Sequence, residues 1–197
     1  GSSAASDVYK RQFKNLGIDP PKPVLLPTFI LPDEKGILKA ETDSTPLIRR
    51  FEVEYEDRKC LPADPALNFL NFLLEDFADE WVTKFMFHYR WHFDEDADNA
   101  GTLLPLAQTT NLPDEIHQSA KKYISERQIE RLRVVGSNDT TAPIIEASYK
   151  RFLSILEKHF KNSPFLLGQR ASSADFGLYG QLSLSLIHIS EPTRLEL

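Results

Sequence analysis

Large apolar and aromatic side chains, with one histidine, recur at steps of three and four residues between positions 66 and 93. They are Leu67, Leu70, Leu74, Phe77, Trp81, Phe85, His88 and Trp91. Side chains at this spacing share one face of an α-helix, so the pattern predicts one long amphipathic helix. Such a stripe has to be buried against other elements, which favours a helical bundle. The acidic run at 94–101, which ends in Gly101, predicts the end of this helix.

Two more helices are predicted after the acidic run, at about 113–135 and about 140–160. A bend with Ser and Pro at 162–164 follows, and the last element is expected to begin at Ser172. Ser172 and Asp175 have the Ser-x-x-acid spacing of a capping box, in which the hydroxyl and the carboxylate each accept a backbone N–H of the other residue. We interpret this pair as a helix start, in preference to a ligand contact.

The part of the chain before position 60 has a different pattern. Short apolar runs at 24–31 and 37–40 flank a turn-rich segment at 32–36, which predicts a β-hairpin. Residues 43–46, Asp-Ser-Thr-Pro, are typical of a helix N-terminus, and the helix is expected to end near Arg58. The fold class predicted from these patterns is α-rich, with a small α+β start followed by an all-α helical bundle.

Charge and composition exclude several classes of function. The net charge is −6 and the basic residues are dispersed among acids, so the chain lacks the basic patch that nucleic-acid binding requires. No apolar run is long enough to span a bilayer, and membrane association is not expected. Cys60 is the single cysteine, so no intrachain disulfide can form, and a cytoplasmic location is expected. We interpret Cys60 as a packing residue.

Both ends of the chain match translated DNA of laboratory origin. Residues 7–12 are encoded by the end sequence of a transposase-based sequencing adapter, and residues 184–194 match its reverse complement with an extension. We therefore expect four parts: a tag and adapter remnant at 1–12, a first domain at 13–60, an all-α domain at 61–183, and an adapter and cloning remnant at 184–197. The natural portion is then a fragment cut during library preparation.

The order of three motifs resembles the glutathione S-transferase family. A proline begins the first strand in Leu26-Pro27-Thr28-Phe29, an acid-Ser helix start follows the hairpin at Asp43-Ser44, and residues 165–176 read FLLGQRASSADF. The resemblance covers nearly all of 13–183. It implies that 13–60 is part of a thioredoxin-like domain lacking its first βαβ unit, and that 61–183 is the helical C-terminal domain.

The resemblance implies a glutathione site at the start of the chain. Pro27 would be cis and would present the backbone beside Thr28 to the cysteinyl part of glutathione. Ser44 would bind the γ-glutamyl carboxylate at a helix N-terminus, where an anion is favoured, and Asp43 would meet the ammonium group. Two simpler readings stay open: Asp43 or Ser44 caps the helix, and Pro27 is a trans residue that begins an edge strand.

The long helix borders the acceptor-substrate pocket in the resembled family, so Met86, Tyr89 and Arg90 are expected pocket residues. His88 and His92, four apart and close to the acids at 94–98, suggest a metal site as an alternative. No third ligand has a defined spacing, so we predict no metal and interpret the two histidines as part of an aromatic helix face.

The resemblance implies a parent enzyme that conjugates or reduces small electrophiles with glutathione as co-substrate. Its thiol-activating Ser, Tyr or Cys would precede Phe13, so no catalytic residue is assigned and this fragment is expected to be inactive. The expected partners are glutathione, a small electrophile and, as in many family members, a second copy in a homodimer. The alternative is a non-catalytic binding or scaffold protein, since a fold does not determine a function.

Overall fold

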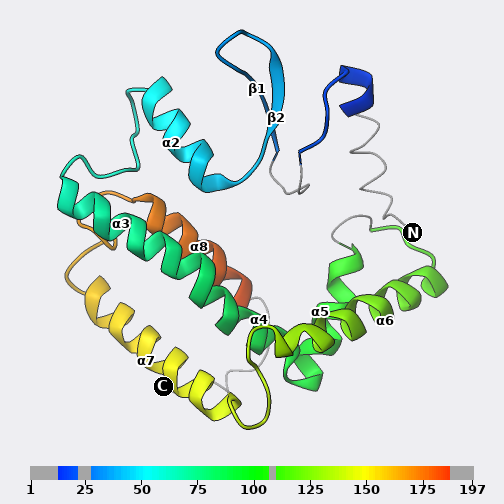
Figure 1. Cartoon of the computed structure of the whole chain (residues 1–197). Helices are drawn as coiled ribbons and strands as arrows, with labels where there is room; N and C mark the ends of the chain where they lie inside the picture. The colour runs from blue at the N-terminus through cyan, green and yellow to red at the C-terminus, as the bar shows by residue number, and fades with distance from the viewer. Residues whose placement is uncertain (1–12, 22–27, 107–109, 187–197) are drawn as a thin grey trace. The chain divides into compact units, whose positions relative to one another are not determined.

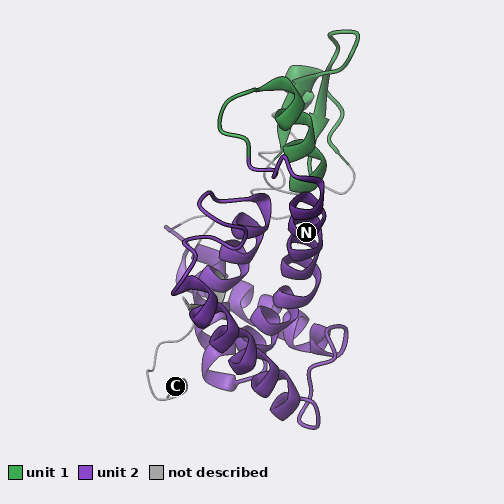
Figure 2. Ribbon diagram, turned by 90° about the vertical axis from the view of Figure 1, so that its left-hand side faces the viewer, with its two compact units in different colours: residues 1–59 green, residues 60–197 purple. Residues whose placement is uncertain are grey.

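The computed structural model describes residues 13–21, 28–106 and 110–186. The chain divides into two compact units, Gly1–Lys59 and Cys60–Leu197, which are coloured separately in Figure 2. The first unit holds a β-hairpin and the helix that follows it, and the second unit is helical. The predicted α-rich chain with a small α+β start is therefore confirmed.

The hairpin of the first unit consists of β1 (Phe29–Pro32) and β2 (Leu38–Glu41), which are antiparallel. The Asp33 carboxylate accepts the backbone N–H groups of Lys35 at 2.9 Å and Ile37 at 3.0 Å, which fixes the loop between the strands. The prediction of a hairpin is confirmed, and residues 24–27 of the first predicted strand lie outside the described residues.

The first unit continues into α2 (Ser44–Glu54), which begins at the predicted position and buries Leu47. The expected end near Arg58 is wrong, because the helix stops at Glu54 and the backbone at Tyr55 is extended. Arg58 itself has a φ of 58°, which a right-handed helix does not permit.

The second unit begins with a helical run made of α3 (Pro65–Phe77), a π-helical segment (Ala78–Val82) and α4 (Thr83–Trp91). The predicted long helix is therefore present, but with a π-helical interruption that rotates one half of its side chains relative to the other. The predicted stripe is only partly buried: Phe77 and Phe85 pack against a core cluster and Trp91 is buried, but three members are not. Its members Leu67, Leu70 and Trp81 are exposed, whereas Asn71 and Glu75 are buried.

The long helix ends at Trp91, shortly before the acidic run, as predicted, but the run itself is helical. It forms the start of α5 (Asp94–Leu106), with Asp94, Glu95 and Asp96 in the first turn. Acidic side chains in the first turn interact favourably with the partial positive charge of a helix N-terminus, so the run begins a new helix instead of a loop.

The remaining helices are α6 (Asp114–Glu130), α7 (Ala142–Phe160) and α8 (Ser173–Leu186), with a 3₁₀ turn (Arg131–Arg133) after α6. They agree with the predicted segments to within a few residues, and α8 continues three residues past position 183. Figure 1 shows α3 and α8 side by side, and the two helices are in contact.

The start of α8 confirms one half of the predicted capping box. The Asp175 carboxylate accepts the Ser172 N–H at 2.8 Å, as expected. The Ser172 hydroxyl, however, donates to the same carboxylate at 2.7 Å. The other oxygen of Asp175 accepts the N–H of Leu166 at 2.9 Å, so this side chain joins the preceding loop to the helix.

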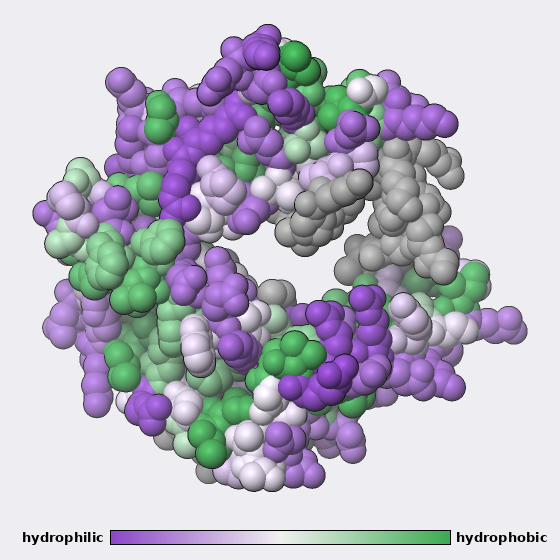
Figure 3. All heavy atoms as spheres, in the orientation of Figure 1, coloured by the Kyte–Doolittle hydropathy of each residue, from purple (hydrophilic) through white to green (hydrophobic). Residues whose placement is uncertain are grey.

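Two apolar clusters form the core of the second unit. One contains Ala78, Val82, Leu156 and Leu178, and the other contains Trp91, Ala97, Ala100 and Leu132. Apolar side chains also lie on the surface, where green patches interrupt the polar residues of the face seen in Figure 3. Among the described helices, none has the length and apolar character that crossing a membrane requires.

Candidate functional site

The turn between β2 and α2 contains an unusual backbone conformation at Asp43. Its φ is 81° and its ψ is 120°, whereas residues other than glycine seldom have a positive φ. Such a conformation costs about 1–3 kcal/mol and persists only where the surrounding structure enforces it, commonly at ligand-binding sites. Asp43 is exposed and is followed at once by Ser44, the first residue of α2.

The N-terminus of α2 offers backbone donors to an anion. The Asp43 carboxylate accepts the Thr45 N–H at 3.2 Å, which caps one donor, and Pro46 has no N–H. Ser44 is exposed, and its hydroxyl has no hydrogen-bond partner among the residues that the structure describes. The helix dipole adds partial positive charge here, so this terminus has the chemistry to accept a carboxylate.

Thr28 lies at the same end of the hairpin as Asp43. The last pair at this end of the hairpin is Phe29 with Glu41. Thr28 comes directly before Phe29 in one strand, and Asp43 comes two positions after Glu41 in the other. The hairpin therefore brings together three of the four residues that the sequence assigned to glutathione. Pro27 lies outside the described residues.

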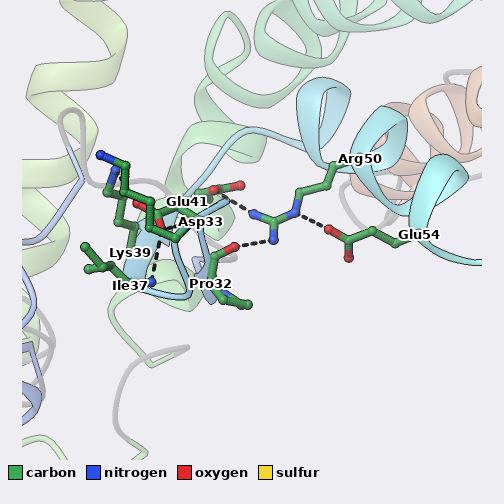
Figure 4. Close-up of polar contacts among 8 residues, drawn as sticks. Pro32, Asp33, Ile37, Lys39, Glu41, Arg50 and Glu54 are labelled. Atoms are coloured by element: carbon green, nitrogen blue, oxygen red, sulfur yellow. Dashed lines mark hydrogen bonds and ion pairs between the residues drawn. The ribbon is translucent and has the colours of Figure 1, made fainter.

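Arg50 connects the segments around this turn, as Figure 4 shows. Its Nη1 donates to Glu41 Oε1 at 2.7 Å, its Nη2 to the Pro32 carbonyl oxygen at 2.6 Å, and its Nε to Glu54 Oε1 at 2.6 Å. The sequence reasoning did not identify Arg50. The spacing of Arg50 and Glu54 is that of an ion pair on one helical face, but nothing in the sequence indicates the contacts with the hairpin.

A second ion pair lies beside this network. Lys39 contacts the Asp33 carboxylate at 2.9 Å, and this hydrogen bond, with those from Ile37 and Lys35, lowers the pKa of Asp33. The hairpin and α2 enclose an open hollow of about 860 Å³. It is lined by Pro32, Asp33, Glu34, Lys35, Ile37, Lys39, Glu41, Arg50 and Glu54. Ion pairs join Lys39 to Asp33 and Arg50 to Glu41 and Glu54, so most of the charged side chains of the hollow are paired with one another.

The predicted pocket residues Met86, Tyr89 and Arg90 lie half-buried on α4, in the second unit. The Tyr89 ring packs on Tyr149, with ring centroids 5.0 Å apart. Burial raises the pKa of the Tyr89 hydroxyl and lowers the pKa of Arg90, so the phenol is neutral at physiological pH. That these residues line a substrate pocket stays a prediction.

His88 of α4 lies in the helical core, and His92, the residue that follows the helix, is half-buried beside it. His88 is fully buried, hydrogen-bonds through Nδ1 to Ser137 Oγ at 2.8 Å, and stacks on His92 with ring centroids 4.6 Å apart. Burial, with His92 as a smaller cause, lowers the pKa of His88 to about 4. The described residues contain no group of three side chains suited to hold a metal ion.

Comparison with solved structures gives a likeness in fold. The chain is similar to a crystal structure of a glutathione S-transferase from Rhodospirillum rubrum F11, with a TM-score of 0.44 and 18% sequence identity. The alignment covers 84% of this chain and 59% of that chain, so the chain spans less than two thirds of that protein's length.

No protein-family model matches the chain, and no curated protein matches it. The transferase activity belongs to the Rhodospirillum rubrum protein. For this chain, the case for glutathione rests on the geometry of the turn at Asp43 and Ser44.

Proposed function

We propose that this chain belongs to a glutathione-dependent enzyme of the glutathione S-transferase type, and that the N-terminus of α2 binds the γ-glutamyl end of the tripeptide. The observation that carries this proposal is the positive φ of Asp43, 81°, directly before an exposed serine that begins a helix. A capped helix does not need such a conformation. Asp64 caps α3 through the Leu67 N–H at 2.9 Å with an ordinary φ of −70°.

The chemistry of the γ-glutamyl group matches the turn. This group carries a carboxylate and an ammonium on one carbon atom, and the turn carries a helix N-terminus and a carboxylate on adjacent residues. In the proposed complex the Ser44 hydroxyl and N–H donate to the ligand carboxylate, where the dipole favours negative charge. Asp43 uses one oxygen for the Thr45 N–H, and we assign its other oxygen to the ligand ammonium.

The proposed reaction of the whole protein is attack of the glutathione thiolate on a small electrophile in the cytoplasm. A sulfur–carbon bond forms and the electrophile either loses a leaving group or takes up a proton. We assign to this chain the binding and orientation of glutathione, through Thr28, Asp43 and Ser44. Met86, Tyr89 and Arg90 on α4 are the residues that we propose for the electrophile.

A thermal melt with and without millimolar glutathione, followed by circular dichroism, tests the binding site. A ligand that binds only the folded state raises the midpoint in proportion to the logarithm of its concentration once the site is saturated. We expect an upward shift for the wild type and a smaller one for Ser44→Ala, which keeps the backbone N–H but loses the hydroxyl. Asp64→Asn is the matched control, because it changes a helix cap outside the site, and its shift should equal that of the wild type.

A wild-type protein that melts cooperatively without any shift would refute the proposed site. Equal shifts in the wild type and Ser44→Ala would contradict the role assigned to the Ser44 hydroxyl.

A further inference from the structure

Arg50 holds three segments of the first unit with three different nitrogen atoms. It reaches the last residue of β1 through the Pro32 carbonyl oxygen, the last residue of β2 through Glu41, and the last turn of α2 through Glu54. All three donor–acceptor distances are 2.6 or 2.7 Å, and the Arg50 side chain is 23% exposed. We call Arg50 and its three partners, Pro32, Glu41 and Glu54, the clamp, and Figure 4 shows the partners around the guanidinium group.

Two members of the clamp, Glu41 and Arg50, flank the strained turn on its two sides. Only Thr42 and Asp43 lie between Glu41, where β2 ends, and Ser44, where α2 begins. The Arg50–Glu41 pair therefore joins the residue before the turn to the helix after it, and the bond to Pro32 fixes the neighbouring strand as well. A positive φ at a residue other than glycine persists only where the flanking structure prevents relaxation, and these contacts supply that restraint.

We infer that Arg50 is a positioning residue for the site at Asp43 and Ser44: its clamp on Glu41 and Pro32 holds the turn in the conformation that receives a carboxylate-bearing ligand. The ligand assignment rests on the proposed function, whereas the restraint on the turn does not. Arg50 lies six residues after Ser44 and acts through the backbone.

These three contacts require the guanidinium group of an arginine. Its planar fork presents several donors in fixed directions, and the Glu54 contact orients that fork on the helix surface. A lysine would keep the positive charge, but its single ammonium cannot reach three acceptors in the same geometry. The substitution Arg50→Lys therefore separates the geometry of the clamp from its charge.

Two measurements on the whole chain test the inference. The first is hydrogen exchange at the Thr45 amide without ligand, which reports opening of the turn. The second is the dissociation constant of glutathione by isothermal titration calorimetry. For Arg50→Lys we expect faster exchange and a dissociation constant raised about three- to tenfold, since strain of about 1 kcal/mol is no longer restrained. The milder Glu41→Gln should change both quantities in the same direction.

One further variant serves as a control. Lys39→Gln breaks the neighbouring ion pair with Asp33 on the same hairpin but does not touch the clamp, so both quantities should stay at their wild-type values.

Unchanged exchange and unchanged affinity in Arg50→Lys would overturn the inference, and so would an equal effect of Lys39→Gln. If the wild type binds no glutathione, the proposed function fails while the exchange rates still decide the role of Arg50. In that case faster exchange in Arg50→Lys supports the clamp, and wild-type exchange overturns it.

Discussion

Asn71 on α3 donates a hydrogen bond from Nδ2 to the Ser173 hydroxyl at the start of α8, across 2.7 Å and 102 positions of sequence. The same hydroxyl donates to Glu75 Oε2 at 2.6 Å, and Asn71 Oδ1 accepts the Ala174 N–H at 3.1 Å. Asn71, Glu75 and Ser173 are all buried. The two helices are thus joined by buried polar contacts that share the Ser173 hydroxyl and the Asn71 amide.

Removing the shared hydroxyl should destabilise the helical unit. Ser173→Ala leaves Asn71 and Glu75 buried without this partner, which we expect to lower the free energy of unfolding by about 2–3 kcal/mol. Urea unfolding followed by circular dichroism measures the loss. Ser183→Ala is the matched control on the same helix, because its hydroxyl donates only to the Gly180 carbonyl at 3.2 Å. A loss for Ser173→Ala no larger than for Ser183→Ala would contradict the coupled arrangement.

The sequence predicts elements better than it predicts which face of an element is buried. The hairpin and the start of α2 follow from local turn and capping signals, which act over a few residues. The stripe of α3 does not, because Leu67 and Leu70 are exposed while Asn71 faces α8. Asn71 is hydrogen-bonded to Ser173, which lies 102 positions further along the chain, and no local sequence pattern connects the two residues.

The candidate site, too, is predicted by the sequence only in part. Asp43 and Ser44 are found from the helix-start signal, since that signal and the site share the same residues. Arg50 is not found, because its contacts with Glu41 and Pro32 depend on how the hairpin lies against α2. The acidic run predicts the end of the long helix but not the start of α5, although acidic side chains are favourable in the first turn of a helix.

Two helical glycines provide a paired test of the packing. A Cβ on Gly101 of α5 would collide with Ser125 Oγ and contact the Lys121 side chain of α6, whereas a Cβ on Gly180 of α8 would meet nothing within 4 Å. Gly101→Ala should therefore destabilise the protein by about 1–3 kcal/mol, as overpacking does. Gly180→Ala should stabilise it by about 0.5–1 kcal/mol, because alanine favours the helix. Thermal melts of both variants decide this, and equal effects would contradict the close approach of α5 to α6.

The buried His88 makes stability depend on pH. Its pKa is lowered to about 4 in the folded protein from 6.5, so the unfolded chain binds this proton more readily. The contribution is fully present above pH 6.5 and is lost as the pH falls from about 6.5 to about 4, amounting to about 3 kcal/mol. Urea unfolding across this interval should show the decrease.

His88→Gln keeps a side chain able to bond Ser137 but does not titrate, so its stability should fall less steeply over the same interval. His159→Gln, on the exposed face of α7, should retain the wild-type slope. An identical pH dependence in His88→Gln and the wild type would contradict the assignment.

The most direct test of the central claim is a titration of the ¹⁵N-labelled chain with glutathione, followed by the backbone amide signals. We expect saturable chemical-shift changes at Ser44 and Thr45 and little change in the amide signals of the rest of α2. Cysteinylglycine, which lacks the γ-glutamyl group, should cause no such changes. Shifts confined to other segments, or equal shifts with cysteinylglycine, would contradict the assignment of this helix N-terminus as the γ-glutamyl site.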